Sequence, residues 1–435
     1  MGRFLRWMLV MSALVGVDRA EAQEPRPERP YRGLFASGVD DAEQLLTANV
    51  SAGGGYDTNL VADAFGRPNT VINDFNQQFK GTLGTISAGL TYTVSRERIG
   101  FGATAASTGR YYPNQELEFV RRDYASAGTS VVLGAGFSAQ ASAIYQPYTL
   151  NSMTPWVFEP QVDDPVPVDE DFPSSLEHYF GYSAGLNYLR RISSRTTFSS
   201  VYSYAGREPS GNVERFGRHL AGASLTHTLG RGLDLRLGYQ FSQAQYGGDD
   251  RHQNHLIDAG VNYNRALSVS RRTRLFFATG TSASSTEPNG SLQYRATGAA
   301  RLAHEIGRTW IASVSYERGL RFSESWFEPL FTNSASAGLN GFFSRRVRAQ
   351  LVGRWVDGVS LEGEDGIETY SALAGLSYAV TRNINAGVNY SYYVHESYYG
   401  RALGSDVPLP PGYAEDFERR SIRAYVSLWA PLFQR

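Results

Sequence analysis

The chain has 435 residues, of which 42% are hydrophobic and 19% are charged, and it contains 45 glycines, 27 tyrosines and no cysteine. Without cysteine, a disulfide scaffold, a cysteine nucleophile and a thiolate metal site are all excluded. The formal net charge of −1 argues against nucleic acid or another polyanion as a partner held by bulk charge. A soluble chain of this length would be expected to hold about three domains.

The first 22 residues are organised as a secretory signal peptide. A positively charged start precedes the apolar run 7–17, and Ala20-Glu21-Ala22 forms a small-residue cleavage site. The other interpretation, an N-terminal membrane anchor, is disfavoured because the run is too short to cross a bilayer as a helix. The signal peptide predicts export, and residues 23–44 form a proline-rich leader that we expect to be extended.

From residue 45 onward, apolar and polar residues alternate along the chain. Residues 86–94 place Ile, Ala, Leu, Tyr and Val on one face and small residues on the other, and the pattern returns in 233–242, 372–380 and 422–428. A period of two indicates extended strands with two different faces. No later stretch is apolar for long enough to form a membrane-spanning helix.

The strands are joined in pairs by short turns that recur at a regular interval. Candidate turns lie near residues 96, 134, 192, 230, 270, 308, 345 and 382. Their spacing is 37 to 40 residues, except for one gap of 58 that an insertion at 151–175 explains. Longer polar loops separate the pairs. With one further strand at each end, the pattern predicts 18 strands of about 10 to 15 residues, with both termini on the short-turn side.

This pattern predicts an all-β protein, specifically a transmembrane outer-membrane antiparallel β-barrel of about 18 strands, connected as an up-and-down meander. A β-propeller repeats at a similar interval, but its strands are short and each blade needs four of them. Aromatic residues cluster at both strand ends, as in the girdles that lipid–water interfaces select. They are Tyr92, Tyr188, Tyr263, Trp310, Phe343, Tyr378 and Trp429 near the short turns, and Tyr145, Tyr204, Tyr246, Tyr316, Trp355 and Tyr398 near the long loops.

The end of the first predicted strand carries the segment GGGYDTNL, residues 53–60. A first strand that ends in Gly-Tyr-Asp-x-Asn-aliphatic resembles the β-barrel porin 2 family of bacterial outer membranes, and the resemblance covers residues 45–435. The C-terminal strand, with Tyr425, Trp429 and Phe433, also looks like the terminal strand of such barrels, although Pro431 interrupts it and two residues follow the last aromatic. The resemblance implies recognition by the barrel-insertion machinery, and some members of the family are associated with exopolysaccharide export.

If the apolar face meets lipid, the opposite face lines the interior. Continuing the alternation places ten charged residues there, seven of them arginines: Arg110, Asp234, Arg236, Asp258, Arg295, Arg301, Glu317, Arg321, Arg354 and Arg423. Fixed positive charge in a pore favours anions and neutral hydrogen-bonding solutes over cations. Alternatively, these arginines pair with luminal carboxylates and merely fill the barrel.

The longest loop is the candidate for a constriction of the pore. Residues 151–175 carry several prolines together with Asp163, Asp164, Asp169, Glu170 and Asp171. In general porins the third loop folds into the lumen, and the length and position of this loop are similar. An acidic loop that faces luminal arginines would set up a transverse field across the channel. Alternatively, the loop lies on the surface and binds divalent cations between lipopolysaccharide phosphates.

Catalytic and metal-binding patterns are largely absent from the sequence. His252 and His255 lie three residues apart and point to opposite faces of a strand, which argues against a metal site. A hydrolase site on the barrel rim is the remaining enzymatic alternative. We therefore expect a non-enzymatic outer-membrane channel for small hydrophilic or carbohydrate solutes, without a cofactor. A plugged barrel that exports polysaccharide with periplasmic components is the second hypothesis. In either case lipid and lipopolysaccharide would surround the barrel.

Overall fold

The computed structural model describes residues 42–58, 80–113, 119–149, 173–209, 215–230, 232–246, 250–267, 270–285, 293–321, 330–360, 366–397 and 416–435. In these ranges the regular secondary structure consists of strands, and no helix is long and apolar enough to cross a membrane. The signal peptide and almost all of the proline-rich leader lie outside the described residues, and so does the acidic loop.

The described part of the chain forms 18 strands. Their bounds are β1 Gln44–Asp57, β2 Gly81–Ser95, β3 Ile99–Tyr111, β4 Phe119–Gly134, β5 Phe137–Thr149, β6 Pro173–Arg191, β7 Thr196–Pro209, β8 Phe216–Gly230, β9 Leu233–Tyr246, β10 Asp250–Leu267, β11 Ser270–Ser285, β12 Gln293–Ile306, β13 Trp310–Arg321, β14 Leu330–Phe342, β15 Val347–Ser360, β16 Gly366–Ala379, β17 Ile384–Ser397 and β18 Asp416–Gln434.

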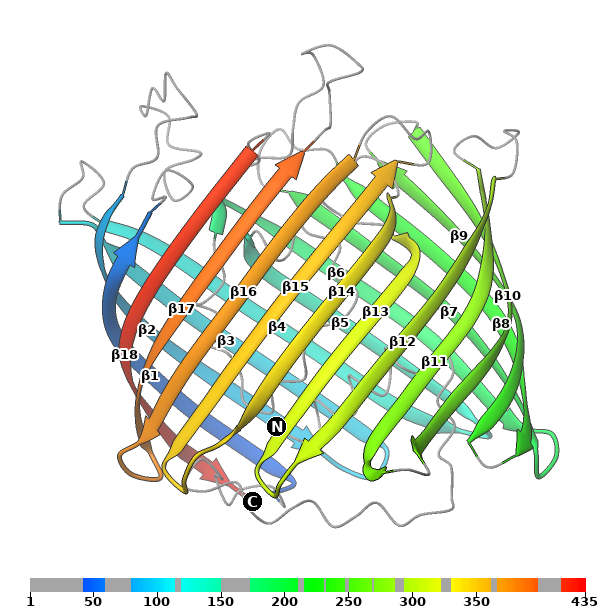
Figure 1. Ribbon diagram of the computed structural model, residues 1–435, viewed down its shortest axis with the longest axis horizontal. Coiled ribbons are helices and arrows are strands. Elements are labelled where there is room, and N and C mark those ends of the chain that lie inside the picture. Colours follow the sequence, from blue (N-terminus) through cyan, green and yellow to red (C-terminus); the bar gives the residue numbers. More distant parts are fainter. Residues whose placement is uncertain are drawn as a thin grey trace.

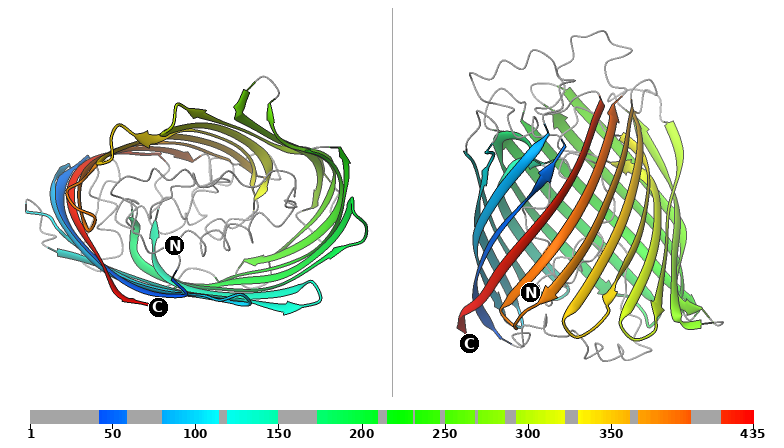
Figure 2. Two further views of the ribbon diagram at one scale, coloured as in Figure 1. Left: turned by 90° about the horizontal axis from the view of Figure 1, so that it is seen from below. Right: turned by 60° about the vertical axis from the view of Figure 1, so that its left-hand side comes forward.

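Each strand pairs antiparallel with its neighbours in sequence, and β1 also pairs with β18, which closes the sheet (Figure 1). The two described ends meet at this seam, where Gln44 and Arg435 exchange backbone hydrogen bonds of 3.0 and 2.9 Å. The barrel is oval in cross-section, with β8–β10 at one narrow end and β1, β2 and β18 towards the other (Figure 2). Closure provides every strand with two hydrogen-bonded neighbours.

The two faces of the sheet differ in the way that the alternation predicts. Sixteen aliphatic side chains on twelve of the strands point outward and expose 39–59% of their surface. They are Val50, Ile86, Leu90, Leu186, Leu225, Leu235, Leu237, Ile257, Leu302, Val314, Leu351, Leu376, Val388, Ile422, Val426 and Leu428. A soluble monomer does not expose an apolar surface of this extent. The polar residues between them point into the interior.

The predicted architecture is confirmed: the barrel is closed and antiparallel, it has 18 strands, and both described ends lie on the short-turn side. Short connections occur at the expected turns, although residues 268–269 of one turn lie outside the described part. Five strands are longer than expected, and β6 and β18 reach 19 residues. Strands tilted across a barrel and extended beyond a lipid boundary need this extra length.

The exterior aromatic belts include Tyr145, Tyr316, Tyr378 and Phe343, which expose 41–68% of their surface. The expected assignment of Trp429 to the exterior belt is wrong. Trp429 stands opposite Asn49, on the luminal face of the seam. The pairing of β1 with β18 also shifts between Leu46 and Thr47, next to Pro431, because proline has no N–H to donate to the ladder.

The seam depends on a close approach between the glycines of β1 and the backbone of β18. A Cβ atom at Gly55 would overlap the carbonyl oxygen of Ile422, and a Cβ at Gly53 would overlap that of Ala424. Both glycines lie on the luminal face beside Arg423 and Tyr425. Two of the three consecutive glycines, Gly53 and Gly55, therefore let the first and last strands approach each other.

We predict that Gly55→Ala destabilises the barrel by about 1–3 kcal/mol, because backbone on β18 must move to admit the methyl group. Gly84→Ala on the neighbouring strand β2 is the matched control, since a Cβ there meets nothing within 4 Å. Urea unfolding followed by heat-modifiable gel mobility measures both variants. Equal midpoints for the two variants would contradict this role of Gly55.

Candidate functional site

The lumen is the candidate functional site, and the strand registers define which residues face it. On β3, exposed Ile99 and Tyr111 point outward, so the intervening even-numbered residues point inward. The same argument on β9 starts from exposed Leu235, Leu237 and Tyr239 and places the even-numbered residues inside. Residues that stand directly opposite each other in neighbouring strands share a face, which extends the assignment around the barrel.

The registers place all eight arginine and glutamate residues that the sequence suggested for the pore on the luminal face. They are Arg110 on β3, Arg236 on β9, Arg295 and Arg301 on β12, Glu317 and Arg321 on β13, Arg354 on β15 and Arg423 on β18. Asp234 and Asp258 occupy luminal register positions on β9 and β10. Arg110 is 1% exposed. These residues come from strands on different sides of the barrel, so they do not form one compact cluster.

A buried luminal ion pair joins the first strand to the last. The Arg419 guanidinium donates from Nε to Asp57 Oδ1 at 2.9 Å and from its terminal nitrogen to Asp57 Oδ2 at 2.6 Å. Both side chains are fully buried. Arg423 lies 3.7 Å from the same carboxylate and donates to Ser421 Oγ. Residues 57 and 419 are 362 positions apart in the sequence. Their ion pair therefore holds β1 against β18 in the closed barrel.

Asp57 and Arg419 were not among the pore residues suggested by the sequence. Asp57 is the aspartate of the GGGYDTNL segment, and the alternation places it on the luminal face of the first strand. Arg419 lies four residues before Arg423 on β18 and therefore points to the same, luminal face. The alternation, followed to the ends of both strands, places each of these residues on the luminal face but does not indicate that they pair.

A second luminal carboxylate, Glu317 on β13, interacts with two arginines. Arg321 donates to Glu317 from the same strand, four residues away. Arg301 on β12 interacts electrostatically with Glu317 as well. Arg295 lies over the ring of Phe331 at 4.9 Å from its centre, and Arg318, at an outward register position on β13, lies over the same ring at 5.2 Å. Cation–π contacts of this kind hold guanidinium groups without neutralising them.

Further arginines on the luminal face were not predicted as pore residues from the sequence. Among them are Arg122, Arg207, Arg218 and Arg348. Arg207 lies over the ring of Tyr179 at 5.4 Å, and Arg348 donates to Asn340 Oδ1. They lie toward strand ends, where the sequence pattern is obscured by adjoining loops. Arginine is thus spread over β3, β4, β7–β9, β12, β13, β15 and β18, whereas the described luminal carboxylates are fewer.

Hydroxyl groups line the lumen between the charged residues, and several of them pair across neighbouring strands. Serine faces serine in four such pairs, at 2.5–2.7 Å between the oxygens: Ser51–Ser87, Ser142–Ser183, Ser199–Ser224 and Ser315–Ser336. Cross-strand hydroxyl pairs stabilise a sheet and keep its surface polar. The interior is therefore hydrophilic and carries an excess of arginine.

The histidines do not gather at one place. His252 lies on the luminal face of β10, whereas His255 points outward and accepts or donates a 2.7 Å hydrogen bond with the Tyr239 hydroxyl. His395 is buried on β17 and hydrogen-bonds to Thr369 Oγ1. Within the described ranges, no group of three or more His, Asp and Glu side chains could hold a metal ion.

The expected constriction residues Asp163, Asp164, Asp169, Glu170 and Asp171 lie outside the described residues. Their position relative to the luminal arginines therefore stays a prediction.

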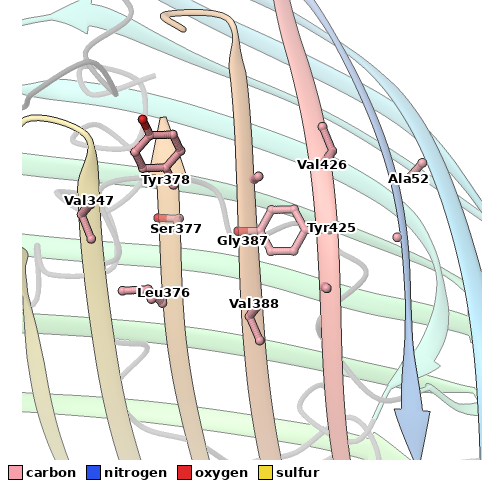
Figure 3. Close-up of a pocket in the computed structure, with 12 residues that line it drawn as sticks. Ala52, Val347, Leu376, Ser377, Tyr378, Gly387, Val388, Tyr425 and Val426 are labelled. Atoms are coloured by element: carbon pink, nitrogen blue, oxygen red, sulfur yellow. The ribbon is translucent and has the colours of Figure 1, made fainter. Parts of the chain in front are cut away.

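On the outside of the barrel, strands β15–β18 and β1 form a shallow apolar recess of about 630 Å³ (Figure 3). Its floor is formed by small residues, among them Ala52, Ala386 and Ala424, and its edges by Leu376, Tyr378 and other large side chains. Inside the wall, the Tyr425 ring covers Gly387. This recess belongs to the apolar exterior and has almost no polar surface.

Comparisons with known proteins give only distant likenesses. No protein-family model and no curated protein sequence matches the chain. Among solved structures, OccK2 (OpdF) of Pseudomonas aeruginosa aligns at a TM-score of 0.44 and 12% identity over 91% of this chain and 99% of its own. OpdQ of the same organism gives 0.43 and 10% over 91% and 99%, and OccAB4 of Acinetobacter baumannii gives 0.42 and 9% over 93% and 100%. The barrel architecture is established by the hydrogen-bonded strand pairings of this chain itself.

We predict that Asp57→Ala lowers the free energy of unfolding by about 3–5 kcal/mol, because it leaves the Arg419 charge buried without its carboxylate. Replacing both residues by leucine should recover much of this loss. Asp123→Ala on β4 is the control, since the Arg121–Asp123 pair is exposed and should contribute less than about 1 kcal/mol. Urea titration of the refolded protein measures all three, and an unchanged midpoint for Asp57→Ala would refute this role of the ion pair.

Proposed function

We propose that this protein is an outer-membrane channel that passes small hydrophilic solutes through the lumen of its 18-stranded barrel. The observation that carries the proposal is the difference in polarity between the outer and the inner face of the barrel. Aliphatic and aromatic residues cover the outside, and arginines and paired serines line the inside.

The exterior supports a lipid environment on physical grounds. A strand can span a bilayer only if its backbone hydrogen bonds are satisfied, and closure of β1 on β18 achieves this without an exposed edge. Outward aromatic pairs such as Phe137–Tyr188 and Trp310–Phe343 lie near the short turns, where a lipid–water interface selects such rings. Outer-membrane lipid and lipopolysaccharide are then the neighbours of the barrel, and the insertion machinery for such barrels is an expected partner.

The interior supports passage of small solutes with a preference for anions. A barrel of 18 strands is wide enough for an aqueous channel unless a segment fills it. Two luminal carboxylates, Asp57 and Glu317, each interact with arginines, and further arginines line other strands. Fixed positive charge lowers the energy of an anion in the pore and raises that of a cation. Sugars and other neutral hydrogen-bonding solutes would be admitted as well.

The resemblance to the β-barrel porin 2 family adds a second candidate function, exopolysaccharide export through a plugged barrel. It rests on the GGGYDTNL segment at residues 53–60. Export predicts a barrel that stays closed to ions until its partners are present, so one recording separates the two candidates.

We expect refolded protein to form ohmic channels in planar bilayers. The measurement needs a parallel demonstration of an intact barrel by heat-modifiable gel mobility. An intact barrel without conductance would overturn the open channel and favour the plugged one.

Charge reversal tests the anion preference. In a potassium chloride gradient, the double variant Arg236→Glu and Arg354→Glu should lower the chloride-to-potassium permeability ratio by about threefold or more. Arg251→Glu is the matched control because Arg251 shares the outward register of Ile257. A cation-selective native channel, or equal ratios for the native channel and the double variant, would contradict the role of luminal arginine.

A further inference from the structure

The luminal wall formed by β9, β10 and β11 contains buried polar atoms that have no hydrogen-bond partner. Within the described part of the chain, Ser242 Oγ, Asn254 Oδ1, Asn262 Oδ1 and Ser282 Oγ have no hydrogen-bond partner. All four side chains are buried, between 0% and 4% exposed. An unmade hydrogen bond at a buried polar atom costs about 1–3 kcal/mol, so four of them on three adjacent strands need an explanation.

The registers bring three of these groups close together. Asn254 stands directly between Ser242 on β9 and Ser284 on β11. Ser282 lies one luminal position further along β11, opposite Arg295 on β12. Gln240, half-buried, occupies the corresponding position on β9. On β10, Leu256 stands between Gln240 and Ser282, so the hydroxyl and amide groups of this wall flank one apolar side chain.

The serines of β9–β11 differ from the serine pairs elsewhere in the lumen. Elsewhere serines on neighbouring strands satisfy each other, as in Ser142–Ser183 and Ser199–Ser224. On β9–β11 the luminal neighbour of Ser242 is an asparagine, and the oxygens of both groups remain available. These oxygens can therefore form hydrogen bonds with a ligand in the lumen.

The backbone is also irregular at this point. Residues 258–261 of β10 stand opposite only two residues of β11, because the pairing jumps from Ile257–Thr281 to Asn262–Ala278. Gly260 makes the close approach possible, since a Cβ there would overlap the carbonyl oxygen of Thr279. Bulges of this kind redirect side chains and are common next to binding sites. The bulge lies beside the narrow end of the oval, where Figures 1 and 2 show the wall turning.

We propose that the luminal wall of β9–β11 is a binding subsite for a neutral polyhydroxylated solute, such as a sugar, on its way through the channel. The subsite deepens the proposed channel function and rests on it. Hydroxyl groups of a sugar both donate and accept hydrogen bonds, which matches the hydroxyls of Ser242 and Ser282 and the Asn254 amide. A simple anion offers no donors and would leave the Asn254 oxygen unsatisfied.

Sucrose is the probe for the test, and its binding is measured in two ways. Saturable reduction of ion current in planar bilayers reports binding in an open channel. Equilibrium dialysis of labelled sucrose against refolded protein in detergent reports binding independently of conductance. Tetraethylene glycol, with few hydroxyl groups, controls for simple filling of the pore.

Asn254→Leu should raise the sucrose concentration for half-saturation by about tenfold, which is the effect of about one lost hydrogen bond to a ligand. Ser282→Ala should act in the same direction. Asn49→Leu and Ser142→Ala are the matched controls, since Asn49 and Ser142 face the lumen on β1 and β5. They should leave half-saturation unchanged. Gel mobility confirms that each variant is folded.

The possible outcomes separate the subsite from the channel. Current with no saturable sucrose binding, or equal half-saturation in Asn254→Leu and the native protein, would overturn the subsite alone. Sucrose binding in detergent that Asn254→Leu weakens, with no current in bilayers, would support the subsite and overturn the open channel.

Discussion

Closure of the sheet is the constraint on which the rest of this structure depends. A strand edge in lipid would leave a row of backbone N–H and C=O groups without partners, at a cost of several kcal/mol for each group. The ladder between β1 and β18 removes that edge, and its geometry explains the glycines at the end of β1. The buried Asp57–Arg419 pair then joins the same two strands through their side chains. Backbone pairing, small residues and charge thus converge on one seam.

Once the sheet is closed, the alternation of side chains determines the chemistry of both sides. The outside can be apolar because only every second residue needs to face it, so a hydrophobic content of 42% is sufficient. The inside collects arginines and serines that would be costly in lipid. The serine pairs satisfy each other across strands, whereas Asp57 and Glu317 hold part of the arginine charge. The wall of β9–β11 departs from this rule, and the departure is what suggests a subsite.

The fold could be predicted from the sequence because its signals are local and repeated. Turn spacing identified 18 strands, and the period of two assigned Arg236 and Leu237 to opposite faces. Features that depend on partners distant in sequence could not be obtained in this way. The Asp57–Arg419 pair joins residues 362 positions apart, and the bulge at 258–261 changes no residue pattern. Trp429 lies on the luminal face because its odd position is opposite in parity to outward Val426 and Leu428, and its place at a strand end alone does not indicate which face it occupies.

The central claim is that one face of each strand meets water and the other meets lipid. Since the chain has no cysteine, single substitutions along β9 test this directly in the refolded barrel in lipid vesicles. The account predicts that Arg236→Cys and Gln240→Cys react with a charged, water-soluble thiol reagent, whereas Leu235→Cys and Leu237→Cys react only with a lipid-soluble one. Labelling that does not alternate with a period of two, or that alternates in the opposite phase, would contradict it.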